Sequence, residues 1–128
     1  MAKTNTQSCE AWLVIDHQLC EGKTGKDKGH AEMTALDELI STSGATVKLA
    51  IAGAKAKLDK ASTKTVYCPS KKCCIKCSYV LKKMGFTPGA DSGWSEEKME
   101  PVAWGVSNNV QALFVVMGID YATVTALA

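Results

Sequence analysis

The stretches that decide the fold of this chain are residues 30–40, His-Ala-Glu-Met-Thr-Ala-Leu-Asp-Glu-Leu-Ile, and residues 74–77, Cys-Ile-Lys-Cys. The first opens a segment in which Met33, Leu36 and Ile40 recur at helical spacing. The second opens a similar segment that runs to Met84. Both stretches are therefore expected to begin helices, over residues 30–42 and 74–84.

The side chains at these two helix starts have the chemistry of a metal site. Residues three apart lie on one face of a helix, so Cys74 and Cys77 can both reach one metal ion. His30 supplies a third ligand from the start of the other helix. Three nitrogen or sulfur ligands leave a fourth position open to water, as in a catalytic zinc site. Glu32 stands two residues past the histidine, close to the metal without being needed as a ligand.

The two motifs together resemble the signature of the zinc-dependent cytidine and nucleic-acid deaminases, His-x-Glu followed by Pro-Cys-x-x-Cys. The resemblance covers roughly residues 29–84. In the family the proline directly precedes the first cysteine, whereas Pro69 here lies five residues before Cys74. The loop is therefore longer, and Cys73 competes with Cys74 as a ligand. Cys74 is preferred because it alone keeps the two-residue gap to Cys77.

This resemblance implies an α/β fold of the cytidine-deaminase type. Its three α/β/α layers would contain a mixed sheet of about five strands with helices on both faces, in one catalytic domain over residues 1–128. It also implies hydrolytic deamination at a zinc ion held by His30, Cys74 and Cys77. Glu32 would move the protons in that reaction.

Candidate substrate contacts are the backbone N–H of Ala31 and the side chains of Trp94, Lys71 and Lys72. Trp94 is interpreted as a core residue under a loop, with a base-stacking role as the alternative. The two lysines belong to a basic stretch over residues 48–83, in which Asp59 is the single acid. Such a stretch is often a solvated helix face, but beside a metal loop it favours phosphate contacts. Lysine positions a nucleic-acid strand more than it reads its sequence.

The function expected from these features is conversion of cytosine to uracil in nucleic acid, with DNA favoured over RNA. The chain most resembles bacterial toxin-type deaminase domains, for which an immunity protein is an expected partner. Such a domain would act in the cytoplasm or as a secreted effector delivered into a target cell. A free-nucleoside deaminase is the first alternative. A non-catalytic zinc-binding nucleic-acid module is the second, with a zinc knuckle built from Cys68, Cys73, Cys74 and Cys77.

Length and composition limit the number of domains and the other classes of protein to which the chain could belong. A chain of 128 residues fits one domain that can bury a core. The sequence has no apolar run of 18 residues and no apolar core of a signal peptide near its first residue, so neither a membrane span nor a signal peptide is expected. The glycine-spaced segment 22–29 fails the spacing of a phosphate-binding loop.

The remaining elements follow from local patterning. Strands are expected over residues 11–16, 17–21 and 64–68, and an amphipathic helix over residues 45–60. Residues 101–106 and 110–117 are interpreted as a β-hairpin that turns at Asn108 and Asn109. A helix over 108–117 is the alternative, and a short helix is expected within 120–128.

Overall fold

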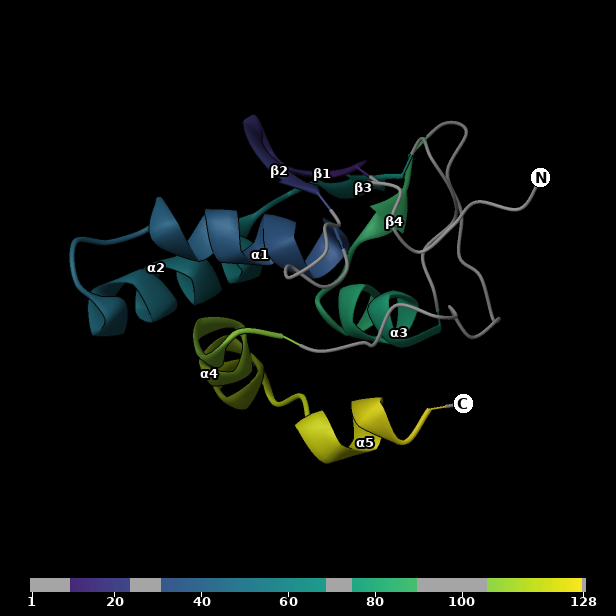
Figure 1. Ribbon diagram of the computed structural model, residues 1–128. Coiled ribbons are helices and arrows are strands. Elements are labelled where there is room, and N and C mark those ends of the chain that lie inside the picture. Colours follow the sequence, from purple (N-terminus) through teal and green to yellow (C-terminus); the bar gives the residue numbers. More distant parts are fainter. Residues whose placement is uncertain (1–9, 24–30, 69–74, 90–105, 128) are drawn as a thin grey trace.

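The computed structural model describes residues 10–23, 31–68, 75–89 and 106–127, which form an α/β fold around a single sheet (Figure 1). The strands are β1 (Glu10–Ile15), β2 (Gln18–Lys23), β3 (Lys64–Tyr67) and β4 (Thr87–Pro88). The helices are α1 (Ala31–Ser41), α2 (Val47–Lys60), α3 (Ile75–Lys83), α4 (Asn108–Met117) and α5 (Tyr121–Thr125). None of these helices combines the length and the apolar character that a membrane span requires.

The sheet is mixed and has the strand order β2-β1-β3-β4. Strand β1 is antiparallel to both of its neighbours, and β4 is parallel to β3. Alternate residues point to opposite faces of a sheet. The side chains on one face are buried, and they are Ala11, Leu13, Ile15, Cys20 and Val66. This face is therefore the one that packs against the core.

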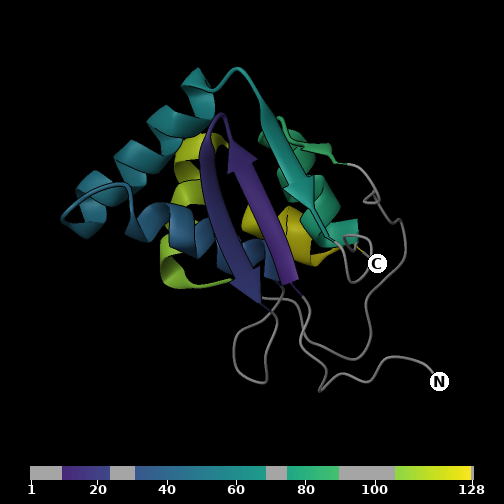
Figure 2. The ribbon, with the colours of Figure 1, turned by 90° about the horizontal axis from the view of Figure 1, so that it is seen from above.

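All the described helices lie on that buried face of the sheet (Figures 1 and 2). Helix α1 contacts β1 and β2 on one side and α2 and α4 on another, while α5 packs against α3. Helix α1 consequently buries a broad, mainly apolar face, while its open side carries Thr34, Asp37, Glu38 and Ser41. Its buried residues are Ala31, Glu32, Met33, Ala35, Leu36, Leu39 and Ile40.

The β-hairpin expected over residues 101–117 is wrong in its second arm, which is helix α4. The Ser107 hydroxyl accepts a hydrogen bond from the Val110 N–H at 3.1 Å and so caps the helix. Gly118 ends the helix in the left-handed conformation, at φ 75°. Buried Val110, Leu113 and Phe114 follow helical spacing. These caps and this period outweigh the strand preference of valine and phenylalanine.

The other expected elements are confirmed, with small differences at their ends. Strands β1, β2 and β3 and helices α1, α2, α3 and α5 lie where the sequence places them. Four strands occur in the described residues, and the helices described there cover one face of the sheet. The fold is therefore α/β with a mixed sheet, while a fifth strand and a second helical layer stay predictions.

The turn between β1 and β2 is tied to the chain that enters β3 through Asp16. Its carboxylate accepts hydrogen bonds from the backbone N–H groups of Ser62 at 2.9 Å and Thr63 at 3.0 Å. The Asp16 N–H donates to the Thr63 carbonyl at 2.8 Å. The bond from Thr63 holds the pKa of Asp16 below its ordinary value. Asp16 also has a positive φ of 53°, which aspartate and asparagine tolerate better than most residues.

Asp16→Asn should lower the melting temperature by a few degrees at pH 7, because the amide keeps the backbone conformation but loses the charge. The folded-state pKa lies below the unfolded one, so this stabilisation is complete above about pH 4 and is lost as the pH falls through the folded value. Asp16→Ala should lower the melting temperature further, by an amount that does not depend on pH, because alanine is strained at positive φ. Thermal unfolding monitored by circular dichroism between pH 3 and pH 7 measures both effects, with the exposed Glu38→Gln as control. If the melting temperature of Asp16→Asn lay below that of the parental chain by the same amount at every pH in this range, the charge of Asp16 would not be the source of the stabilisation.

Candidate active site

The two helices that carry the motifs begin at the same end of the sheet. Trp12 at the start of β1 lies opposite Glu21 near the end of β2 and opposite Tyr67 at the end of β3. Helix α1 follows β2 in the chain, and α3 follows β3. Figure 1 shows the amino-terminal ends of α1 and α3 near the end of β3. This end of the sheet is therefore the candidate site.

A glycine in β2 sets the position of the first turn of α1. A Cβ atom on Gly22 would overlap the backbone carbonyl oxygen of Ala31 and the backbone nitrogen of Ala35. No side chain fits there unless the backbone shifts, so the strand and the helix touch through their main chains. This close approach fixes the helix turn that contains Glu32.

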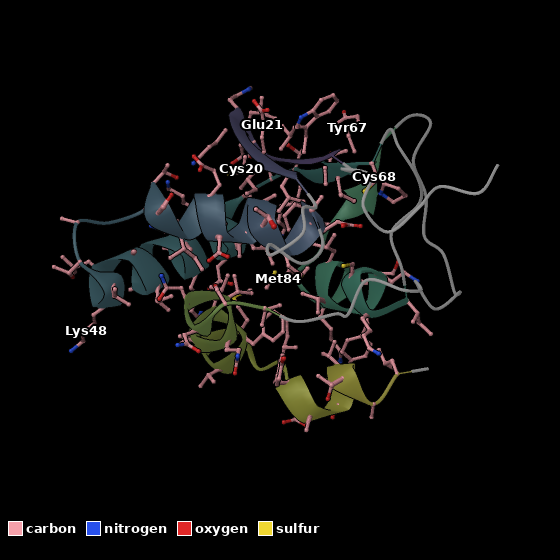
Figure 3. The ribbon with its side chains drawn as sticks, in the orientation of Figure 1. Cys20, Glu21, Lys48, Tyr67, Cys68 and Met84 are labelled. Atoms are coloured by element: carbon pink, nitrogen blue, oxygen red, sulfur yellow. The ribbon has the colours of Figure 1, made fainter. Side chains whose placement is uncertain are left out.

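Glu32 is a carboxylate removed from water. It lies in the first turn of α1 and is only 7% exposed. The thiol of Cys68, at the end of β3, donates to its Oε2 atom across 3.7 Å. A helix amino terminus also favours negative charge. Figure 3 shows Cys68 at this end of the sheet. A buried carboxylate is costly unless it is partnered, and the partner placed here is a thiol.

Cys68 is a site residue that the sequence analysis assigned only to the alternative zinc knuckle. The signal that identifies it is the period of two along β3. Val66 is buried against the helices, so Cys68 must point to the same face. Cys68 is 3% exposed, and its thiol is free of any disulfide.

Of the three predicted zinc ligands, the described residues contain Cys77. It lies in the first turn of α3, is fully buried and is not part of a disulfide. A thiol at that place fits the donor set of a zinc site, for which cysteine and histidine are the usual ligands. His30, Cys73 and Cys74 lie outside the described residues. Among the residues that are described, no group of three histidine, cysteine or acidic side chains could hold a metal ion. The zinc site therefore stays a prediction.

The predicted substrate contacts are placed only in part. Ala31 is the first residue of α1 and is 2% exposed. Trp94, Lys71 and Lys72 lie outside the described residues, so their roles stay predictions.

The described lysines of the basic stretch lie on α2, β3 and α3. Several of them contact groups of this chain. Lys57, Lys64 and Lys76 donate to the backbone carbonyls of Thr42, Leu58 and Leu127, and Lys55 pairs with Asp59. Lys83 lies over the ring of Tyr79. Lys76 in particular ties the start of α3 to the C-terminal segment. Several of these lysines therefore have contacts within the chain, and the phosphate contacts stay a prediction.

Comparisons of the chain with protein-family models, with curated proteins and with solved structures found no match. The resemblance to the deaminases therefore stays a prediction from the residues of the two motifs.

The contact between Cys68 and Glu32 should appear as an energetic coupling. Cys68→Ala, Glu32→Gln and the double variant should differ from additivity by about 0.5–3 kcal/mol in the free energy of unfolding, the range for residues in contact. Denaturant unfolding of the four proteins measures this coupling.

Cys20→Ala is the matched control for this cycle. Cys20 is another buried thiol on the same face of the sheet. Burial raises its pKa, and the Glu38 carboxylate, further along α1, adds to the shift. Its cycle with Glu32→Gln should be additive within about 0.5 kcal/mol. Additivity in both cycles would show that the thiol of Cys68 does not support Glu32.

Proposed function

We propose that this chain is a zinc-dependent hydrolytic deaminase that converts cytosine to uracil in nucleic acid, with DNA favoured over RNA. The observation that carries the proposal is the position of Glu32. Its carboxylate is buried in the first turn of α1, at the sheet end where α3 begins with buried Cys77. Carboxylates are seldom buried without a partner or a task, and removal from water is a common feature of catalytic groups.

The cofactor in this proposal is a zinc ion held by His30, Cys74 and Cys77. When bound, zinc lowers the pKa of a water molecule towards about 7 and so makes a nucleophile available at neutral pH. The other contributions come from the chain itself: a dry pocket, a proton carrier and groups that orient the base.

Glu32 carries the protons in the proposed reaction. Its carboxylate accepts a proton from the water that attacks C4 of cytosine and delivers it to the ring nitrogen N3. It next takes the proton of the new C4 hydroxyl and gives it to the amino nitrogen, so that the C4–N bond breaks, ammonia leaves and the C4 carbonyl of uracil forms. The Cys68 thiol holds Oε2 of Glu32 in place between these transfers. The Ala31 N–H, Trp94, Lys71 and Lys72 are the proposed contacts to the substrate.

The finer parts of the proposal concern the domain and its biological setting. Over residues 1–128 the domain would have about five strands and helices on both faces of the sheet, as the deaminase resemblance implies. The same resemblance supports a bacterial toxin, delivered into a target cell or acting in the cytoplasm, with an immunity protein as its partner.

Glu32→Gln should abolish deamination while leaving the fold and the zinc in place. Glutamine has nearly the same shape but cannot accept and return a proton near neutral pH. General acid–base groups contribute about 10²–10⁴ in rate, and Glu32 acts at several transfers, so a loss at the upper end is expected. The assay is uracil formation in a cytosine-containing oligonucleotide, with zinc measured by elemental analysis.

Glu38→Gln is the matched control, because Glu38 lies on the same helix with its side chain exposed, and it should keep parental activity. A Glu32→Gln protein that retains a tenth of the parental rate would exclude Glu32 from the mechanism. Equal rates on free cytidine and on DNA would favour the nucleoside deaminase instead. Zinc binding without deamination of any cytosine substrate by the parental chain would favour the binding module.

A further inference from the structure

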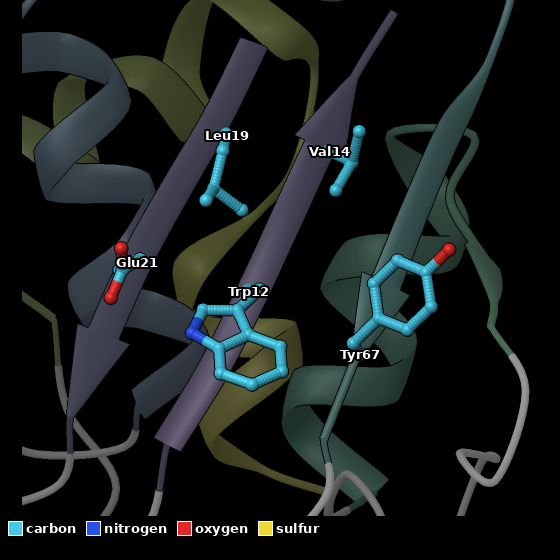
Figure 4. Close-up of a pocket in the computed structure, with 5 residues that line it drawn as sticks. All are labelled: Trp12, Val14, Leu19, Glu21 and Tyr67. Atoms are coloured by element: carbon cyan, nitrogen blue, oxygen red, sulfur yellow. The ribbon is translucent and has the colours of Figure 1, made fainter. Parts of the chain in front are cut away.

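The face of the sheet turned away from the described helices carries a shallow apolar hollow of about 400 Å³. It is lined by the outward-pointing residues of three neighbouring strands, which are Trp12, Val14, Leu19, Glu21 and Tyr67 (Figure 4). The side chain of Leu19 is 54% exposed. The volume lies in the range of small-molecule sites. Exposed apolar area gathered in this way commonly marks a binding surface.

Two aromatic rings form the centre of this surface. Trp12 and Tyr67 lie directly opposite one another on β1 and β3. Figure 4 shows both rings broadside, lying along the sheet with their flat faces turned outward. Gly89 packs against the Tyr67 ring, since a Cβ atom there would overlap the ring, and the Gly89 N–H donates to the Val66 carbonyl at 2.8 Å. The ring of Tyr67 is thus supported from the side by backbone.

The polar chemistry of the hollow suits a base and not a phosphate. Among the described residues that line it, the charged one is Glu21, which lies opposite Trp12 on β2, and none is a lysine. A carboxylate repels phosphate but accepts hydrogen bonds from amino groups such as N4 of cytosine. Flat aromatic rings stack with unpaired bases of any kind, and exposed aromatics on a sheet are one known way to bind single strands.

The hollow also adjoins the candidate active site. Tyr67 points outward at the end of β3, and the next residue, Cys68, points inward and contacts Glu32. The two surfaces are therefore opposite faces of the same sheet end. A nucleic-acid strand whose target base enters beside Glu32 can pass around this end of the sheet and place a flanking base on the rings of Trp12 and Tyr67.

The geometry points to single-stranded nucleic acid as the substrate, with an unpaired base near the target stacked on Trp12 and Tyr67 and hydrogen-bonded to Glu21. This inference rests on the proposed deaminase function, and it requires that the second helical layer of the proposed fold leave Trp12 and Tyr67 uncovered. Paired bases in a duplex are already stacked on their neighbours, so this surface discriminates against duplex substrates.

The test measures binding of a fluorescently labelled, cytosine-containing single-stranded oligonucleotide by anisotropy, in the Glu32→Gln background so that nothing is turned over. Removing a stacking side chain weakens binding about 5- to 150-fold per base. Trp12→Ala with Tyr67→Ala should therefore raise Kd at least about tenfold. The slope of log Kd against log salt should not change, because no phosphate contact is removed. Trp12→Phe with Tyr67→Phe should bind nearly as the parental chain does.

Leu49→Ala is the control for truncation of an exposed apolar side chain, since Leu49 is 59% exposed at the start of α2, away from this face. It should leave Kd unchanged. An unchanged Kd in the double alanine variant, or an equal loss of duplex binding, would overturn the inference. So would a parental dimer in sedimentation that the double variant makes monomeric, because a second copy of the chain would then be the occupant.

Failure of this inference can be told apart from failure of the proposed function. With Glu32 restored, the double alanine variant should raise KM for the oligonucleotide and leave kcat within about twofold. If Kd does not respond while Glu32→Gln is still inactive, the stacking surface fails and the deaminase stands. If Kd responds but the parental chain converts no cytosine, the surface binds single strands and the proposed reaction fails.

Discussion

The structure depends on the burial of helix α1 from two sides. The sheet strands β1 and β2 cover one side, and α2 and α4 cover another. A helix in that position buries a broad face that must be mainly apolar, and Glu32, the charged residue on that buried face, is consequently held out of water. The close main-chain approach at Gly22 fixes the turn from which that carboxylate projects. The packing of the core and the chemistry of the candidate site are thus set by the same helix.

Strand β3 links the candidate active site on one face of the sheet with the apolar hollow on the other. Because side chains alternate along a strand, Tyr67 and Cys68 are sent to opposite faces of the sheet by one step of the chain. The inward residue meets Glu32 across 3.7 Å, and the outward residue lies beside Trp12 in the apolar hollow. One strand end therefore supports a buried polar pair on one face and a pair of partly exposed rings on the other. The proposed deamination of a base in a nucleic-acid strand requires sites for the target base and for its neighbour, and this strand end would provide both.

Much of the fold could be predicted from periodicity, because α1, α2 and the strands β1 to β3 bury apolar residues at regular spacing. Helix α4 was interpreted as a strand because valine and phenylalanine favour sheets, whereas Ser107 and Gly118 at its ends decide for a helix. The contact of Cys68 with Glu32 could not be predicted from spacing alone. It depends on which face of β3 meets α1, and that is a tertiary property. The lysine stretch favours phosphate contacts in the sequence, and the contacts that several of its lysines make with carbonyls and a ring of this chain depend on the tertiary structure.

The central claim is that the starts of α1 and α3 together hold a catalytic zinc ion, and X-ray absorption at the zinc edge of the purified chain tests it most directly. The account predicts about one zinc per chain, with two sulfur ligands at about 2.3 Å from Cys74 and Cys77 and a histidine nitrogen at about 2.0–2.1 Å from His30. One further light atom in the fourth position would be water. A shell of four sulfur atoms would contradict it by showing a closed structural site, and so would a folded chain that binds no zinc.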